Sequence, residues 1–303
     1  IRLTASANHT PRIETEILLP DDVKRIELRN MIQVDFLYAK QASYFAFPWA
    51  MSQPTFRYDI ANGFVNPAKD LLEGGCSDWF AVQHLVNVED GKSSVNLATV
   101  DAPLVCLGDI YRGRWLPQFT NSSPAVFSYA LNNHWSAKWA GKKSGELLYH
   151  YAITSESRFD PARAARFGRE ARCPLEVAEL KSSDKLPGRR GTLPPGTASF
   201  AGLTPENLLV AALKPAEDGE GLIVRVCEIG GGETDGLLQL PGMAIVSARE
   251  ANAVEVTGGR LQSTGHEVKF HIKPHQVLTM RLEVRAQKTW QNDSSRIIEG
   301  QAK

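Results

Sequence analysis

The feature that most constrains this chain is an alternation of polar and apolar residues, with a period of two, that recurs along most of its length. Residues 25–36 carry it, and it is the pattern of a β-strand with one buried face. Residues 79–88 form a second strand-like run, which an Asp90-Gly91 turn joins to an antiparallel partner at 94–100. The stretch 51–78 is rich in Pro, Gly and Asn and is predicted to be a long loop. Further strands are predicted at 104–107, 126–131 and 146–153.

A short helix and a linker separate this array from a second one. Asp160 as N-cap, Pro161 at the first helical position and Gly168 near the end predict the helix. The polar stretch 181–202, rich in Pro and Gly, marks the domain boundary. Beyond it, strands spaced as in a β-sandwich are predicted at 207–213, 221–228, 243–246, 253–256, 267–272 and 277–284.

The predicted fold class is therefore all-β, with two antiparallel β-sandwiches in sequence. The larger occupies residues 1–157 and the smaller, C-terminal one residues 200–286. Between them, 158–199 is a linker with the short helix, and 287–303 is a polar tail.

Charge and hydropathy exclude several classes of protein. The 303 residues carry 34 basic and 34 acidic side chains, so there is no basic surplus for nucleic acid or an anionic membrane surface. No run approaches 18 consecutive apolar residues, which excludes a spanning helix. The first residue is Ile1 and no signal-peptide pattern follows, so we expect the chain to begin inside a longer polypeptide, with its first sandwich truncated.

The four cysteines lie far apart and form no C-x-x-C pair, which disfavours a zinc ribbon or a redox dithiol. Cys106 and Cys227 sit within apolar strand-like runs. Buried free thiols are therefore favoured, although two disulfides remain compatible with the sequence.

Signatures of catalysis are mostly missing. Gly91-Lys92-Ser93 lacks the upstream Gly of a phosphate-binding loop, and the glycines at 230–232 lack the context of a dinucleotide fingerprint. His271 and His275 have a helical zinc spacing, but Pro274 and strand alternation argue against a helix there. His84 is expected to be a hydrogen-bonded structural residue.

Two polar segments remain as candidate sites. Glu217, Asp218 and Glu220 cluster at the predicted tip of a hairpin, where solvated turn acids are ordinary and burial is too small to separate two pKa values. Residues 127–139 leave a strand and bring together two amides, an imidazole and two indoles. Amides can form hydrogen bonds with hydroxyl groups, and indoles can stack on the apolar faces of sugars, so this composition is typical of a carbohydrate-binding edge. A loop anchored by tryptophan is an alternative explanation of the same residues.

Several motifs, in the same order along about residues 20–285, resemble the region that follows the catalytic domain in glycoside hydrolase family 38, the α-mannosidases. The motifs are Tyr44-Phe-Ala-Phe-Pro48, Cys76-Ser-Asp-Trp-Phe80, Thr99-Val-Asp-Ala-Pro-Leu-Val105, Leu131-Asn-Asn-His-Trp135, the hairpin 209–225 and the strand pattern 272–282. The closest resemblance is to large bacterial members of the family.

This resemblance implies a galactose-mutarotase-like β-sandwich followed by a smaller sandwich. It also implies that the nucleophilic Asp and the zinc ligands lie in an N-terminal domain that no part of this chain matches. We therefore expect no catalytic residue, no metal ligand and no cofactor in this stretch, with zinc in the absent domain. The expected partners are that catalytic domain and a mannose-containing glycan, with no nucleic acid and no membrane.

By position in the family, a group of five residues comprises the candidates for carbohydrate contact: Asn132, Asn133, His134, Trp135 and, more weakly, Asp101. Asp101 precedes Ala-Pro and is equally explained as a turn-former. The function predicted is scaffolding of the catalytic domain with contact to carbohydrate.

Two alternatives stay open. One is a stand-alone carbohydrate-binding module. The other is mutarotase-like epimerisation, which would pair His84 or His134 with Glu146, although their spacing gives no support. Neither the compartment, bacterial cytoplasm or periplasm, nor the linkage cleaved follows from the sequence.

Overall fold

The computed structural model describes residues 1–36, 40–110, 117–132, 144–177 and 199–286. It divides into two compact units, residues 1–174 and 175–303. Both units are built from antiparallel sheets, which confirms the predicted all-β class. No helix in the described part of the chain is long and apolar enough to span a membrane.

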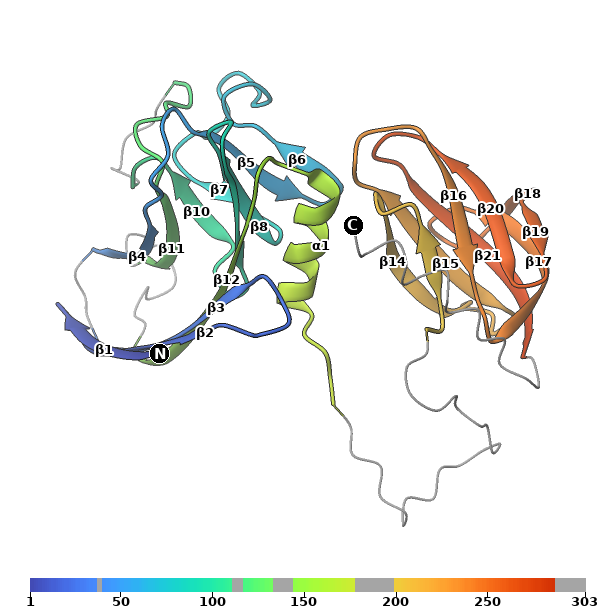
Figure 1. Ribbon diagram of the computed structural model, residues 1–303, viewed down its shortest axis with the longest axis horizontal. Helices are drawn as coiled ribbons and strands as arrows, with labels where there is room; N and C mark the ends of the chain where they lie inside the picture. The colour runs from blue at the N-terminus through green and yellow to red at the C-terminus, as the bar shows by residue number, and fades with distance from the viewer. Residues whose placement is uncertain (37–39, 111–116, 133–143, 178–198, 287–303) are drawn as a thin grey trace, which may run out of the picture. The chain divides into compact units, whose positions relative to one another are not determined.

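The first unit is a sandwich of two unequal sheets (Figure 1). In sheet order, the eight-stranded sheet contains β1 (Arg2–Ala7), β2 (Thr10–Leu18), β3 (Ile26–Val34), β12 (Gly145–Glu156), β9 (Ser94–Thr99), β8 (Leu85–Glu89), β5 (Thr55–Ile60) and β6 (Gly63–Val65). The four-stranded sheet contains β4 (Ala42–Phe47), β11 (Val126–Asn132), β10 (Leu104–Leu107) and β7 (Phe80–Ala81).

Aromatic side chains join the two layers of this sandwich. Tyr151 on β12 is 2% exposed, and its ring centroid lies 5.5 Å from that of Phe45 and 4.9 Å from that of Phe47, both on β4. Val86, Val88 and Leu97 are completely buried in the same core. Because each strand alternates, its other residues face away from this core, and on β8 and β9 they meet a helix instead.

Helix α1 (Pro161–Arg172) packs on the outer side of β8 and β9. Asp160 caps it, since its carboxylate accepts hydrogen bonds from the backbone N–H groups of Ala162 (2.9 Å) and Arg163 (3.0 Å). The sequence predicted this cap but placed the helix in a linker and ended it near Gly168. In the structure the helix belongs to the first unit and continues for four residues beyond Gly168.

Gly168 allows close packing of α1 against the sheet and does not end the helix. A Cβ atom at this position would lie 2.8 Å from His84 Cβ and 2.8 Å from Leu85 Cδ2. The missing side chain therefore lets the helix approach the sheet.

The second unit is a smaller sandwich of a four-stranded and a five-stranded sheet. The first contains β13 (Gly202–Thr204), β16 (Thr234–Gln239), β20 (Glu267–Ile272) and β19 (Gln262–Thr264). The second contains β14 (Leu208–Pro215), β15 (Leu222–Glu228), β21 (Val277–Ala286), β17 (Met243–Ala251) and β18 (Thr257–Arg260). Leu208, Leu238, Ile272, Met280 and Leu282 are fully buried between them.

Some predicted elements were wrong. Residues 253–256 are a turn, because Asn252 Oδ1 accepts from the N–H groups of Val254 (3.1 Å) and Val256 (3.0 Å). The predicted loop 51–78 contains β5 and β6. The run 79–88 is split into β7 and β8. The four cysteines are free thiols, and Cys106 and Cys227 are buried as predicted.

Gly168 offers a test of the helix packing. In an exposed helix, Gly→Ala stabilises by about 1 kcal/mol. Here we expect Gly168→Ala to lower the free energy of unfolding by about 1–3 kcal/mol, because the added methyl group meets His84 and Leu85. Urea unfolding followed by circular dichroism measures the change, and stabilisation would show that the contact is loose.

Candidate functional site

Asp101 is one of the two predicted carbohydrate-contact residues within the described part of the chain. It follows β9, and its Oδ2 accepts a hydrogen bond from the backbone N–H of His150 (2.7 Å) and lies 2.7 Å from His150 Nδ1. The Asp101 side chain is 37% exposed. Both contacts use one oxygen, and among the described residues Oδ1 has no hydrogen-bond partner. Asp101 thus links β9 to β12 and still presents an acceptor to solvent.

Asn132 is the other described candidate, and it is the last residue of β11, opposite Ala42 of β4. Asn133, His134 and Trp135 lie outside the described residues. Asp101 lies just beyond the end of β9 of the eight-stranded sheet, and Asn132 ends β11 of the four-stranded sheet. The two candidates therefore follow strands of opposite sheets of the sandwich.

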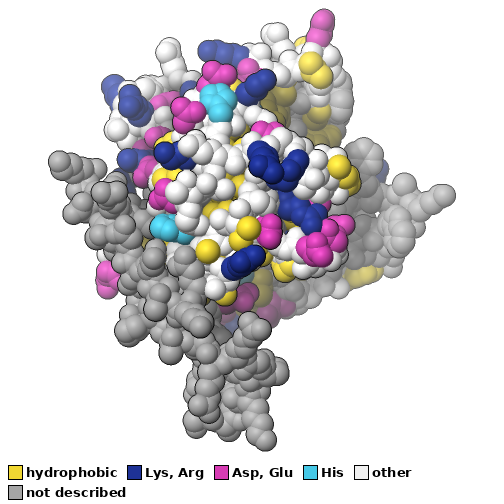
Figure 2. Space-filling view, turned by 90° about the vertical axis from the view of Figure 1, so that its right-hand side faces the viewer, with side chains coloured by type: hydrophobic (Ala, Val, Ile, Leu, Met, Phe, Trp, Pro, Cys, Tyr) yellow, Lys and Arg dark blue, Asp and Glu magenta, His cyan; other side chains and the backbone are white. Residues whose placement is uncertain are grey.

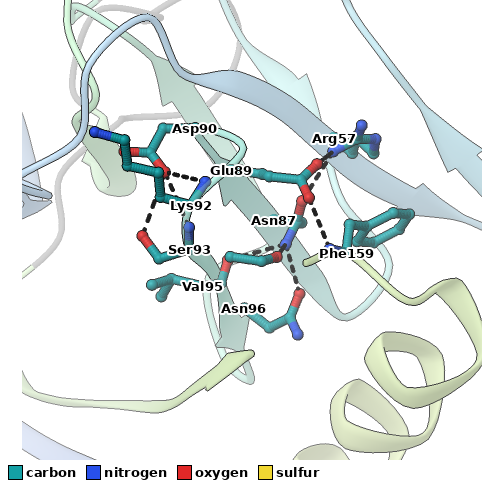
Figure 3. Close-up of polar contacts among 10 residues, drawn as sticks. Arg57, Asn87, Glu89, Asp90, Lys92, Ser93, Val95, Asn96 and Phe159 are labelled. Carbon is teal, nitrogen blue, oxygen red and sulfur yellow. Dashed lines mark hydrogen bonds and ion pairs between the residues drawn. The ribbon is translucent and has the colours of Figure 1, made fainter. Parts of the chain in front are cut away.

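A buried polar cluster on the outer side of β8 and β9 was not predicted from the sequence (Figure 3). Asn87 is completely buried, and its Nδ2 donates to Ser94 Oγ (2.7 Å), Val95 O (3.2 Å) and Asn96 Oδ1 (3.0 Å). Ser94 is also completely buried and Asn96 is 3% exposed. Buried amides need such partners, so the three side chains satisfy one another across the β8–β9 pair.

Charged side chains complete this cluster beneath the segment that leads into α1. Arg57 Nη1 lies 2.8 Å from Glu89 Oε2 and 3.3 Å from Asn87 Oδ1. Glu89 Oε1 accepts from the backbone N–H of Phe159 (2.8 Å), and the Arg57 guanidinium lies 4.6 Å from the centre of the Phe159 ring. Each of these side chains has at least one hydrogen-bond or ion-pair partner, so we assign the cluster to holding the helix against the sheet rather than to binding a ligand.

His84 is held by a buried carboxylate, as expected for a structural histidine. Asp59 is 4% exposed; its Oδ2 lies 2.6 Å from His84 Nδ1, and its Oδ1 accepts from the N–H groups of His84 (2.7 Å) and Leu85 (2.9 Å). The predicted partner for epimerisation, Glu146, is exposed on β12. Within the described residues, Asp59 is the only polar partner of the His84 ring, so the structure does not support that pair.

Glu228 at the end of β15 is the most strongly hydrogen-bonded carboxylate of the second unit. It is completely buried and accepts from Gly230 N (2.6 Å), Gly231 N (2.9 Å), His275 N (2.9 Å) and Asn207 Nδ2 (2.8 Å). Burial alone would raise the pKa of Glu228, but these donors outweigh it and hold the pKa below its ordinary value. The glycines at 230–232, predicted to be a loop, are thus a turn wrapped around an ionised carboxylate.

The acidic tip of the β14–β15 hairpin is also used structurally. Asp218 Oδ2 lies 2.6 Å from Arg281 Nη2. The N–H of Glu220 and, next, the Arg281 guanidinium lower the pKa of Asp218. Glu255 is 7% exposed; it lies 2.5 Å from Lys214 Nζ and accepts from the N–H of Glu217 (2.8 Å). These acids hold the tip against neighbouring segments.

The outer face of the four-stranded sheet in the second unit carries an open groove of about 520 Å³, lined by Asp235, Gly236, Leu237, Gln262, Lys269, Phe270 and His271. His271 Nδ1 lies 2.9 Å from Asp235 Oδ1, and this hydrogen bond raises the pKa of His271. His271 is on β20, so it does not share a helical face with His275. Among the described residues, no three His, Cys, Asp or Glu side chains are grouped to hold a metal ion.

Two successive antiparallel β-sandwich units define the class of all-β domains to which the described part of the chain belongs. Residues 207–280 match the family model for the glycosyl hydrolases family 38 C-terminal beta sandwich domain, which confirms the resemblance seen in the motifs. No sequence among the curated proteins matches the chain.

Two solved structures from Enterococcus faecalis share the fold. One is an alpha-mannosidase from strain V583 and the other a protein in the glycosyl hydrolase family 38; each aligns with a TM-score of 0.66 and 14% sequence identity over 90% of this chain. The chain spans 29% and 30% of their lengths. The family match is to a C-terminal sandwich domain and the structural matches are to part of longer chains, which does not favour a stand-alone binding module.

Glu228 generates a prediction about pH. Because its pKa is lower in the folded than in the unfolded chain, it stabilises the fold fully above about pH 4.3, the ordinary value for Glu, and this contribution falls as the pH drops through the folded pKa. In Glu228→Gln an NH2 group faces N–H donors, so we expect a loss of about 1–3 kcal/mol at pH 7. Urea unfolding between pH 3 and 7 measures both effects. A variant as stable as the parent at pH 7 would contradict this account.

Proposed function

We propose that this chain is the non-catalytic C-terminal β-sandwich portion of an α-mannosidase-like retaining glycoside hydrolase, and that it scaffolds a catalytic domain. The observation that carries the proposal is the family match over residues 207–280. The shared fold with an α-mannosidase, of which the chain spans about 30%, supports it.

The chemistry of the described carboxylates also supports a non-catalytic role. Retaining glycosidases need two carboxyl groups about 5–5.5 Å apart, one ionised and one protonated. Asp218 and Glu228, by contrast, have lowered pKa values, and both are held by N–H donors. Groups of this kind stabilise loops and cannot readily donate a proton at neutral pH.

The first test of this proposal is an activity assay. The purified chain, with and without added zinc, is expected to give no hydrolysis of 4-nitrophenyl α-mannoside above the buffer background. An active α-mannosidase in the same assay is the control. Turnover that copurifies with the chain and saturates with substrate would refute the non-catalytic assignment.

Contact with carbohydrate is the finer part of the proposal, and it rests on Asp101, Asn132 and the segment from Asn133 to Trp135. The free acceptor on Asp101 and the position of Asn132 at a strand end are consistent with a polar rim. In a larger hydrolase, this rim would contact the mannose-containing glycan beside the catalytic domain.

The second test measures that contact directly. We expect an α-linked mannose oligosaccharide to shift NMR signals of the chain, and Asn132→Ala and Trp135→Ala to weaken the interaction by about fivefold or more. Asp101→Asn keeps an acceptor oxygen and is expected to bind nearly as the parent does. The control is Asn252→Ala in the second unit. Unchanged affinity in both Asn132→Ala and Trp135→Ala would remove these residues from the proposal.

A further inference from the structure

The outer face of the five-stranded sheet in the second unit carries a row of basic residues. Arg281 on β21 pairs with Arg249 on β17, which in turn pairs with Arg260 on β18. Directly paired residues share a face, and neighbouring strands lie about 4.8 Å apart, so the three arginines form a line of roughly 10 Å. Arg225 on β15 lies on the same face, in the next row, opposite Thr279. We call these four residues the arginine row.

Half of this charge has no carboxylate partner. Arg281 is paired with Asp218, Lys214 on the same face is paired with Glu255, and Glu255 also interacts electrostatically with Arg225. Among the described residues, no carboxylate lies within ion-pair distance of Arg249 or Arg260. Glu283, in the row beyond Arg281, accepts a hydrogen bond from Ser247 (3.3 Å). Like charges placed directly opposite one another destabilise a sheet, so folding alone gives no reason for this alignment.

Neutral partners hold two of the guanidinium groups in place. Arg249 Nη2 donates to Gly258 O (2.8 Å), and Arg225 donates to Ala253 O (2.5 Å) and Thr279 Oγ1 (3.2 Å). These bonds orient the guanidinium groups without cancelling their charge. Arg225 and Arg249 are therefore positioned in advance of any ligand.

The edge strand beside the row is open. All four residues of β18 are exposed, and they include Gly258 and Gly259. No atom lies within 4 Å of a Cβ placed on Gly259. Figure 2 faces the side on which β17 and β18 lie in Figure 1, and it shows Lys and Arg side chains alongside acidic ones, with only scattered hydrophobic groups. An extended ligand could approach Arg249 and Arg260 across the exposed strand β18.

We propose that the arginine row binds a linear polysaccharide that carries carboxylate or sulfate groups. A guanidinium presents a fork of donors that matches both anions, and a line of charges matches a repeating anion better than a single small one. The row contains no aromatic platform for single-stranded nucleic acid. A protein partner would need pockets for apolar anchors, and a flat sheet face offers few. This site is independent of the proposed function.

The test is binding of the whole chain to heparin, to polygalacturonate and to neutral mannan, measured by isothermal titration calorimetry at low ionic strength. We expect binding to at least one of the two acidic glycans, weakening with added salt, and none to mannan at this site. Binding to heparin but not to polygalacturonate would identify sulfate as the recognised group. Binding to polygalacturonate would identify carboxylate. Absence of binding to both would overturn the proposal.

Matched variants locate the site. Arg249→Ala with Arg260→Ala should weaken binding by about tenfold or more. Lys269→Ala with Lys273→Ala, which removes the same charge from β20 of the other sheet and the turn that follows it, should change binding by less than about twofold. Arg260→Glu leaves the Arg249–Gly258 bond intact and should also abolish binding, which covers the case where the double variant unfolds. Equal losses in both double variants, or equally tight binding of duplex DNA, would overturn the assignment.

Discussion

The structure of the first unit depends on the burial of β8 and β9 from both sides. Val86, Val88 and Leu97 face the core between the two sheets, while Leu85 and Ala98 meet helix α1. A strand pair covered on both faces cannot leave its polar side chains to water, so each must find a partner within the protein. The contacts among Asn87, Ser94 and Asn96 follow from this constraint.

The same constraint explains which parts of the fold the sequence could predict. Strands with a clear alternation, such as 94–100 and 267–272, lie where they were predicted, because alternate residues of each point into the core between two sheets. β5 and β6 form a local hairpin, but they were missed because turn-forming residues surround them, and β5 also depends on its pairing with β8, about thirty residues further along the chain. The role of Gly168 depends on the approach of α1 to β8, and no local pattern encodes a contact across more than eighty residues.

The candidate site was predictable only in part. The sequence singled out Asp101, but its contact with His150 joins residues 49 positions apart and required the register of the sheet. The arginine row was equally hidden, since Arg249, Arg260 and Arg281 are brought together only by the pairing of three strands. The polar cluster could have been predicted from one pattern in the sequence. Asn87 and Glu89 alternate with Val86 and Val88 within a buried strand, so their polar side chains need partners inside the protein.

The acidic residues that accept several hydrogen bonds serve to hold segments of the two sandwiches in place. Asp218 accepts the N–H of Glu220 and pairs with Arg281, while Glu228 accepts three backbone N–H groups and an amide. A carboxylate that accepts several hydrogen bonds is stabilised as the anion. These hydrogen bonds stabilise the fold because their donors come from different segments of the chain. General acid catalysis requires the opposite environment, in which burial without donors keeps the proton on. These carboxylates therefore suit a rigid framework better than a reacting centre.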